Sequence, residues 1–586
     1  MCGFAGVVGE AAGQVDEERL ERVIASLAHR GPDGRGRFVA PGVRLVHTRL
    51  SIIDIEGSAQ PMTSASGRFT VVYNGEIYGY RGLRQELATY PFKTQGDTEG
   101  ILALCETAPA RLPSALLGMF AYAVWDATER RLVLGRDRFG EKPLYYANLP
   151  DGGLVFASEI KAILAFGLSS GGIDHESLTH YLHYLSAPPD RTMYSDVASL
   201  PPGCILEWRA GRVRVERYWQ PPTPDASPTE PEAAMELRRL AEQAVQDELV
   251  ADVGVGALLS GGLDSSTIVA LAARAGGSVR TFSFGFPGQI DERPYAREVA
   301  RMYGTNHHES TDETSIADLL YRMIDVYDEP FADSSNVATY LLCKTVAEHV
   351  KVVLSGDGAD ELFGGYDFWY GAADRRLTER GPRAIARALL GRNVLRHHEK
   401  LRDSFPASLL ARAGYGGRTQ ATPWYRRSAL APALPSEERA ESVLAADVCD
   451  YLPADILVKV DRAAMAWGLE VRAPFLHPSV AEYALALPWR LKVGGDRFKR
   501  VFRSAFEDLW PTSVRTRKKQ GFGAPLAAWL ARPDAREVYG DLVETADSPL
   551  GRLFDRRRLA AALDRLDSQQ RWTLLTLALW LQRKAP

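Results

Sequence analysis

The sequence predicts two successive domains of different fold class: an α+β domain over residues 2–219, and an α/β domain over residues 233–586 whose C-terminal part is largely helical. Up to about residue 219, short apolar segments end at Gly, Pro, Asn or Asp, a pattern typical of layered β-sheets with a few helices. A stretch rich in Pro, Ser and Thr then predicts a linker at 220–232. Beyond the linker, helical periodicity alternates with a few short apolar strands.

The composition is that of an ordinary soluble globular protein, with 46% hydrophobic and 25% charged residues among 586. A formal net charge of −4 gives no electrostatic reason to expect nucleic acid or an acidic membrane as a partner. No apolar run is long enough to span a bilayer, and the N-terminus lacks the pattern of a signal peptide. The five cysteines are scattered and form no Cys-x-x-Cys pair, which argues against disulfides or a zinc site and favours a cytoplasmic protein.

The N-terminus carries the candidate nucleophile, Cys2. Removal of Met1 would leave Cys2 with a thiol and a free α-amine, whose reference pKa of about 7.7–8.0 lets it act as a built-in general base. Gly3 and Gly6 are expected to let the backbone pass close to a substrate, and residues 4–8 to form a short buried strand. The alternative is an incidental cysteine at a frayed terminus, and a strand directly behind it argues against that.

Further strands of the first domain are predicted at residues 43–47, 70–73, 120–125 and 132–134. Each segment is largely apolar and is bounded by residues typical of turns. Together they favour an α+β fold of layered sheets.

A candidate phosphate site follows the linker. Residues 253–259 predict a strand, residues 260–264 a loop with two adjacent glycines, and the residues from Ser265 a helix. Glycine backbone N–H groups, the helix N-terminus and the hydroxyls of Ser260 and Ser265 would together bind an anion. The loop is not a Walker A motif, and a Gly-Gly turn before a helix can equally be only a turn.

A second glycine-rich loop, residues 355–366, follows the predicted strand 352–354 and carries Asp357, Asp360 and Glu361. Three carboxylates within five residues are unfavourable unless a cation joins them, and Mg²⁺ bridging ATP phosphates is the obvious candidate. The alternative is an exposed acidic turn. Farther along, the arginine-rich residues 375–402 predict a solvated helix face, with a partner or acidic-substrate surface as the alternative.

Taken together, Cys2 and the two loops resemble the glutamine-dependent asparagine synthetases over nearly the whole chain. The N-terminal part is similar to class II glutamine amidotransferase domains, which have an N-terminal-nucleophile sandwich fold. Their motifs stand here at residues 2–6, 30–34, 47–54, 73–78, 96–99 and 136–140. The C-terminal part is similar to a synthetase domain of the ATP-pyrophosphatase type, with motifs at residues 260–266, 328–335, 355–366, 461–466, 470–476 and 517–522.

The resemblance implies a glutaminase site in the first domain. Cys2 would attack the glutamine carboxamide, and Asn74 and Gly75 would form the oxyanion hole. The residues implied in glutamine binding are Arg49, Ile52, Asn74, Glu76 and Asp97, of which the charged ones suit the carboxylate and amine of glutamine. In the family, the ammonia released travels through an internal channel to the second site.

At that second site the resemblance implies that ATP activates a carboxylate as an acyl-adenylate, which ammonia then converts to an amide. The residues implied in ATP binding are Leu258, Ser260, Gly261, Gly262, Asp264, Ser265, Phe284, Ser355 and Gly356. Asp264 and Asp360 are the Mg²⁺ candidates, Lys499 is the candidate catalytic lysine, and Asp357 and Asp360 mark the acceptor region. A surface lysine is the alternative for Lys499.

The acceptor is left open between aspartate and the carboxylic acid of a secondary metabolite. Asp357 stands where well-studied bacterial asparagine synthetases carry Glu, and the segment 375–426 does not align with them. A non-catalytic relative is a third alternative, against which Cys2 and the intact 260–266 loop both argue. The expected partners are small molecules only: glutamine, ATP and the acceptor. Oligomeric state is undecided, with a homodimer as the working assumption.

Overall fold

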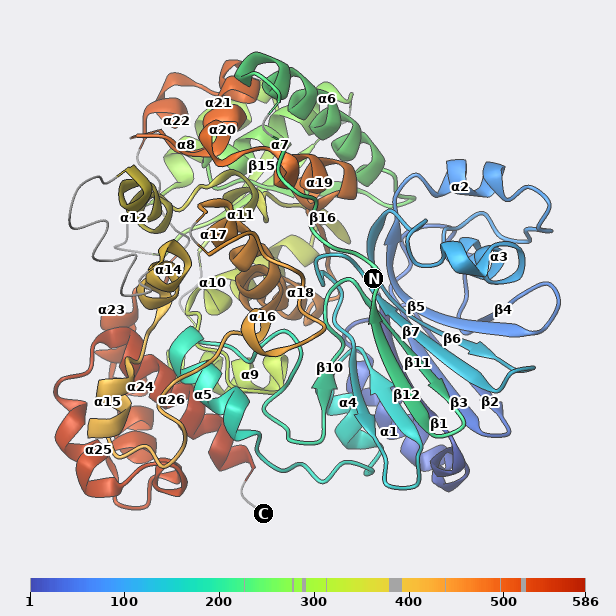
Figure 1. The fold of residues 1–586 in the computed structure, drawn as a ribbon, viewed down its shortest axis with the longest axis horizontal. Helices are drawn as coiled ribbons and strands as arrows, with labels where there is room; N and C mark the ends of the chain where they lie inside the picture. Colours follow the sequence, from blue (N-terminus) through green and yellow to red (C-terminus); the bar gives the residue numbers. More distant parts are fainter. Residues whose placement is uncertain are drawn as a thin grey trace.

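The computed structural model describes residues 2–584 apart from 226, 277–278, 287–290, 312–313, 379–392, 438, 496 and 518–522. Residues 2–217 build two six-stranded sheets, and the following residues build a five-stranded sheet surrounded by helices (Figure 1). Among the described residues, no helix combines the length and the apolar character needed to cross a membrane.

The two sheets of the first part are antiparallel. In spatial order the first contains β10 (Ala198–Ser199), β8 (Tyr145–Asn148), β9 (Leu154–Ala157), β1 (Cys2–Val8), β3 (Val43–Arg49) and β2 (Gly34–Ala40). The second contains β12 (Arg212–Arg217), β11 (Cys204–Arg209), β7 (Arg131–Arg136), β6 (Gly118–Asp126), β5 (Phe69–Ile77) and β4 (Met62–Thr63). The five strands predicted in this part are therefore confirmed as β1, β3, β5, β6 and β7.

These sheets form the middle of a four-layer sandwich, because neighbouring side chains of a strand point to opposite faces. In β5, Val72 lies in the core between the sheets, whereas Val71 and Tyr73 pack toward the outer helix α3 (Glu99–Thr107). In the same way the outer face of the first sheet is covered by α1 (Glu17–Leu27) and α4 (Ile160–Ala165). On the second sheet, α2 (Tyr80–Glu86) packs on the outer face together with α3. Each sheet is thus covered on its outer face by two helices.

Gly3 and Gly6 of β1 allow close packing inside the sandwich. A Cβ at Gly3 would lie 2.7 Å from Thr48 Oγ1, and a Cβ at Gly6 would lie 2.5 Å from the ring of Phe156. Both distances are shorter than van der Waals contact, so these glycines make room for neighbouring side chains within the sandwich.

The third sheet is entirely parallel. Its order is β15 (Asn306–Ser310), β14 (Arg280–Phe284), β13 (Val255–Leu258), β16 (Val352–Leu354) and β17 (Glu470–Arg472). From β13 the chain builds outward through β14 and β15 on one side, and it then returns to place β16 and β17 on the other. The strand order therefore reverses between β13 and β16, and open α/β sheets bind ligands at the carboxyl ends of strands at such a switch point.

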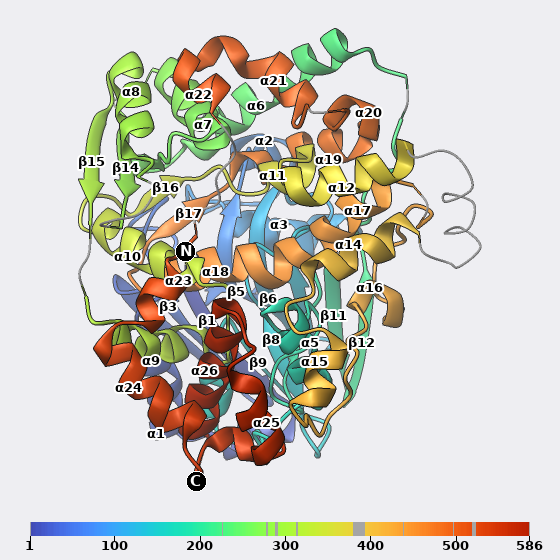
Figure 2. The same cartoon turned by 90° about the vertical axis from the view of Figure 1, so that its left-hand side faces the viewer.

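Helices cover both faces of this sheet (Figure 2). On one face lie α6 (Glu230–Glu248), α7 (Leu263–Arg274), α8 (Arg293–Tyr303), α19 (Pro478–Ala486) and α21 (Arg500–Phe506). On the other lie α9 (Ile316–Tyr327), α10 (Ser335–Ala347) and α18 (Leu457–Met465). The other described α-helices beyond the linker are α11 (Ala359–Phe363), α12 (Asp367–Thr378), α14 (Val394–Arg402), α15 (Ala407–Arg412), α16 (Trp424–Arg427), α17 (Glu441–Ala446), α20 (Trp489–Lys492), α22 (Thr512–Thr516), α23 (Leu526–Leu530), α24 (Pro533–Tyr539), α25 (Arg556–Leu563) and α26 (Ser568–Arg583). Two stretches of this part are π-helical, Asp447–Ile456 and Gly540–Glu544.

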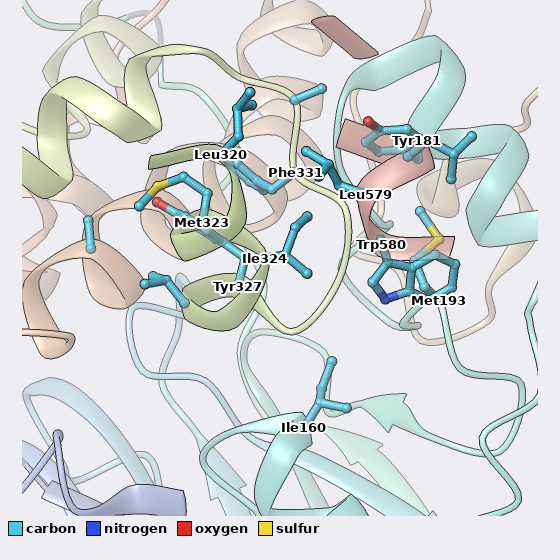
Figure 3. Close-up of a cluster of buried hydrophobic side chains, with 14 of the residues drawn as sticks. Ile160, Tyr181, Met193, Leu320, Met323, Ile324, Tyr327, Phe331, Leu579 and Trp580 are labelled. Atoms are coloured by element: carbon cyan, nitrogen blue, oxygen red, sulfur yellow. The ribbon is translucent and has the colours of Figure 1, made fainter. Parts of the chain in front are cut away.

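One hydrophobic core crosses the boundary between the two parts (Figure 3). Tyr181 of α5 (His175–Tyr184) and Met193 come from the first part, while Tyr327 of α9 and Trp580 of α26 come from the second. Domains joined by a large hydrophobic interface do not move freely relative to each other. The two parts therefore form one docked unit.

Candidate active sites

The first site lies where the two sheets of the sandwich meet at the N-terminus. Cys2 opens β1 directly opposite Arg49 at the end of β3, and Asn74 belongs to β5 of the second sheet. The main-chain N–H of Cys2 donates to Oδ1 of Asn74 at 2.9 Å. Cys2 is therefore held between a residue of its own sheet and a residue of the facing sheet.

Asn74 has the geometry of a free hydrogen-bond donor. Its side chain is fully buried, its oxygen is engaged by Cys2, and its Nδ2 has no hydrogen-bond partner among the described residues. A buried donor without a partner is unfavourable unless a ligand supplies an acceptor. Next to it, Gly75 packs so closely that a Cβ would lie 2.2 Å from the carbonyl oxygen of Met119.

Burial controls the protonation of the nucleophile. Cys2 is nearly inaccessible, and this burial raises the pKa of its thiol above the usual value. The thiol must therefore lose its proton to a neighbouring base as it reacts, because the thiolate is the nucleophilic form.

Arg49 is fixed by the loop that follows it. Its guanidinium donates to the carbonyl oxygens of Ile53, Asp54 and Ile55, at 3.4, 2.8 and 2.7 Å respectively. Ile52, also in this loop, is buried. A cavity of about 340 Å³ opens beside Arg49.

Glu76 and Asp97 form an acidic pair behind Asn74. Burial and the neighbouring Asp97 raise the pKa of Glu76 well above its usual range, against the opposing effect of Arg472, whose Nη2 lies 3.3 Å away. Asp97 accepts hydrogen bonds from the Tyr73 hydroxyl and the Ile77 N–H, both at 3.0 Å. Two carboxyl groups so placed suit a cationic group such as an amine.

Arg30 also belongs to this site. It lies in the motif at residues 30–34, but the sequence alone did not predict a role for it in glutamine binding or catalysis. Its Nε donates to the carbonyl oxygen of Cys2 at 3.1 Å, and its two terminal nitrogens donate to both oxygens of Asp461 at 2.8 and 3.1 Å. It also donates to Glu159 at 2.9 Å and is fully buried. Arg30 thus ties the backbone of the nucleophile to a helix of the second part, and only the tertiary structure reveals that contact.

The second site lies at the switch point of the parallel sheet. The loop after β13 turns at Gly261, whose φ of 71° favours glycine, and α7 begins at Leu263. Within the loop, the hydroxyls of Ser260 and Ser265 are 3.1 Å apart, and the Gly262 N–H faces the Ser260 hydroxyl at 3.3 Å. Hydroxyls and N–H groups at a helix N-terminus form an anion-binding arrangement.

The two predicted loops lie against each other. A Cβ at Gly356 would lie 2.8 Å from Cβ of Asp264 and 3.0 Å from the main-chain nitrogen of Ser265. Ser355 is anchored to β17, because its N–H donates to the carbonyl oxygen of Arg472 at 2.8 Å. The predicted ATP residues Leu258 and Phe284 end the neighbouring strands β13 and β14 at the same edge of the sheet.

Lys499 joins the two loops and does not lie on the surface. Its ammonium nitrogen contacts Asp264 and lies 2.6 Å from Oδ1 of Asp360, and its side chain is 4% exposed. Among the described residues, no group of three or more His, Cys, Asp or Glu is placed to hold a metal. Two converging carboxylates nevertheless fit Mg²⁺, which commonly takes one or two protein carboxylates and completes its coordination with phosphates and water.

The predicted acceptor residues, Asp357 and Asp360, belong to the second of these loops. Burial raises the pKa of Asp357. Nearby, the buried Lys459 donates to Oδ2 of Asp333 at 2.8 Å. A narrow cavity at the boundary between the two parts is lined on one side by Glu141 and Lys142 and on the other by residues that include Ser355, Asp357 and Val471.

The arginine-rich region is not simply a solvated face. Arg402 of α14 is 9% exposed and donates to Oδ1 of Asp447 at 3.1 Å, so the expectation of solvent exposure is wrong for this residue. Residues 379–392 of the region lie outside the described residues, as do residues 518–522 of the motif at 517–522. Arg517 is described, and it donates to the carbonyl oxygen of Gly261 at 3.2 Å.

Comparison with known proteins finds two family models, which match successive stretches of the chain. The family model described as glutamine amidotransferase domain matches residues 1–219, and the one described as asparagine synthase matches residues 236–582. Asparagine synthetase [glutamine-hydrolyzing] 1 of Bacillus subtilis (strain 168) is 31% identical, covering 99% of this chain and 96% of the relative. Asparagine synthetase [glutamine-hydrolyzing] 2 of Arabidopsis thaliana is 33% identical, covering 89% of this chain and 78% of the relative. The chain therefore belongs to the asparagine synthase family of glutamine-hydrolysing amidoligases.

Proposed function

We propose that this protein hydrolyses glutamine at Cys2 and uses the ammonia, with ATP, to convert the side-chain carboxylate of aspartate to the amide of asparagine, releasing AMP and pyrophosphate. The observation that carries the proposal is the pairing of two sites in one docked unit. One has a buried thiol beside an unpartnered donor, Asn74 Nδ2, and the other has an anion-binding loop at a switch point. Under this proposal residues 2–219 are the glutaminase domain, 220–232 the linker and 233–586 the synthetase domain.

In the glutaminase reaction, the Cys2 thiol attacks the carboxamide carbon of glutamine and its proton passes to the α-amine of the mature N-terminus. Asn74 Nδ2 and the Gly75 N–H receive the negative charge that develops on the oxygen. Arg49 binds the α-carboxylate of glutamine, and Glu76 with Asp97 binds its amine. The amide nitrogen of glutamine takes that proton back from the α-amine and leaves as ammonia, and water then hydrolyses the thioester.

In the synthetase reaction, the 260–265 loop binds the β- and γ-phosphates that leave as pyrophosphate. Asp264 and Asp360 would hold Mg²⁺, which neutralises phosphate charge when bound. Lys499, between these two carboxylates, is placed to offset negative charge as the acceptor carboxylate attacks the α-phosphate. Ser355 and Gly356, with Leu258 and Phe284, would contact the adenosine.

The proposal includes transfer of ammonia between the two sites. A small cavity of about 10 Å³ at the domain boundary has Lys142 of the glutaminase part and Asp357 of the synthetase part in its wall, so the acceptor region borders the first domain. An enclosed route would keep ammonia unprotonated and away from bulk water.

The decisive experiment measures pyrophosphate release by the purified protein with ATP, Mg²⁺ and glutamine, with and without aspartate. Aspartate-dependent release with asparagine as product supports the proposal. Glutaminase activity without such release would discard aspartate and favour the second candidate, a secondary-metabolite carboxylic acid as acceptor. That candidate is motivated by Asp357, whose side chain is one methylene shorter than the Glu of bacterial asparagine synthetases.

A further inference from the structure

One loop of the glutamine site is held by hydrogen bonds and an ion pair that involve residues of the synthetase domain. We call residues 49–55 the arginine loop. It begins at Arg49, and three of its carbonyl oxygens accept hydrogen bonds from the Arg49 guanidinium. The side chain of Arg49 can hold its direction only while those three carbonyls keep their positions. The conformation of the arginine loop therefore determines where the guanidinium points.

The centre of the arginine loop has an unusual backbone. Asp54 has a φ of 48°, in the left-handed region that residues other than glycine seldom adopt. Its carboxylate accepts hydrogen bonds from its own domain, from the N–H groups of Gln95 and Gly96 at 2.8 and 3.2 Å and from the Ser58 hydroxyl at 3.1 Å. The main-chain N–H of Asp54 is left for a partner elsewhere.

That partner is Asp252, which lies beyond the linker. Oδ2 of Asp252 accepts from the Asp54 N–H at 2.7 Å, and the Asp252 N–H donates to the carbonyl oxygen of Ile52 at 2.9 Å. Asp252 thus holds the arginine loop by two hydrogen bonds on either side of Ile53.

A second contact holds the start of the loop. The ammonium group of Lys351 lies 2.8 Å from Oδ2 of Asp33, and the same oxygen accepts from the Ser51 N–H at 2.7 Å. Lys351 and Asp33 also line the cavity beside Arg49. Two residues of the synthetase domain therefore hold the arginine loop, one directly and one through Asp33.

Both residues lie at the start of strands that end at the ATP loops. Asp252 comes just before β13, which leads to Ser260, and Lys351 immediately precedes β16, which leads to Ser355. The amino ends of these two neighbouring strands face the glutaminase domain, whereas their carboxyl ends carry the second site.

We propose that Asp252 and Lys351 are positioning residues for glutamine binding, supplied by the synthetase domain to hold the arginine loop in its binding shape. The inference deepens the proposed function and rests on Arg49 binding the glutamine carboxylate. Neither residue touches the reacting atoms. Their loss changes the affinity for glutamine and leaves the chemical step and the second site intact.

The test measures glutaminase kinetics of the full chain without ATP for Asp252→Ala, Lys351→Met and the double variant. The KM for glutamine should rise about fivefold in each single variant, as expected for one exposed hydrogen bond or ion pair, with kcat within twofold of the wild type. Asp252→Asn keeps an acceptor oxygen and should restore most of the affinity. Ammonia-dependent pyrophosphate release should stay at the wild-type rate in all variants.

Asp190→Ala is the matched control, because Asp190 pairs with Arg427 across the same boundary at 2.6 and 2.9 Å but lies between α5 and β10, away from the arginine loop. Its KM for glutamine should be unchanged. An unchanged KM in the Asp252→Ala and double variants, or an equal rise in Asp190→Ala, would overturn the inference. Absence of glutaminase activity in the wild type would instead overturn the proposed function.

Discussion

Lys499 provides the sharpest test of the synthetase site. Its ammonium nitrogen contacts carboxylate oxygens of both Asp264 and Asp360, the latter at 2.6 Å. Those oxygens are therefore within about 5 Å of each other, where two unit charges repel by about 3 kcal/mol at an effective dielectric constant of ~20. Lys499→Met removes the cation that offsets this repulsion and that faces the developing phosphate charge. Because about 1.4 kcal/mol is a factor of ten, ammonia-dependent pyrophosphate release should fall by about 100-fold or more.

The assay supplies ammonia in place of glutamine, so that only the second site is measured. Lys499→Met should keep the wild-type glutaminase rate, which serves as an internal check that the protein is folded. Lys400→Met, at an exposed position of α14, is the control for loss of a lysine and should have no effect on either activity. Pyrophosphate release by Lys499→Met within threefold of the wild type would refute the assignment of Lys499 to the reaction.

Three further predictions concern the first site and the buried histidines. Cys2→Ala should abolish glutamine-dependent synthesis and leave ammonia-dependent synthesis; losing both would mean that Cys2 is structural. Asn74→Ala should lower the glutaminase kcat by about 10²–10³-fold, as for other lost oxyanion donors, and a smaller change would contradict that role. Burial lowers the pKa of His47 and of His180 to about 3, so below pH 6.5 the unfolded chain binds more protons and stability falls as the pH falls. Each contributes about 1.4 kcal/mol per pH unit, and urea unfolding at pH 7 and pH 5 should show a shallower loss for His180→Gln than for the wild type.

Local pattern was enough to predict the elements that carry the sites. The strand behind Cys2 and the strand–loop–helix around Ser260 are each encoded in one contiguous segment, so apolar runs and glycines locate them directly. The switch point was harder to predict from the sequence, because β16, which pairs with β13, is distant from it along the chain. Lys499 could be named only from family resemblance, since nothing near it in sequence indicates that it meets Asp264.

The sequence could not predict the contacts between the domains. Arg30 with Asp461, and Arg472 with Glu76, are buried charges whose partners come from the other domain, and no local spacing encodes such pairs. The same limit explains the error at Arg402. Arginine side chains on a helix are usually exposed to solvent. Arg402 is buried instead, because it pairs with the buried carboxylate of Asp447.

The core shared by the two domains affects the order in which the protein can mature on the ribosome. Tyr181 and Met193 are translated early, whereas Trp580, which packs in the same cluster, belongs to α26, which follows them by most of the chain (Figure 3). Until α26 emerges, the nascent sandwich carries an uncovered apolar surface, the kind of surface that chaperones recognise and that promotes aggregation. A chain that ends before α26 would therefore leave the apolar side chains of Tyr181 and Met193 without the residues that cover them in the complete protein.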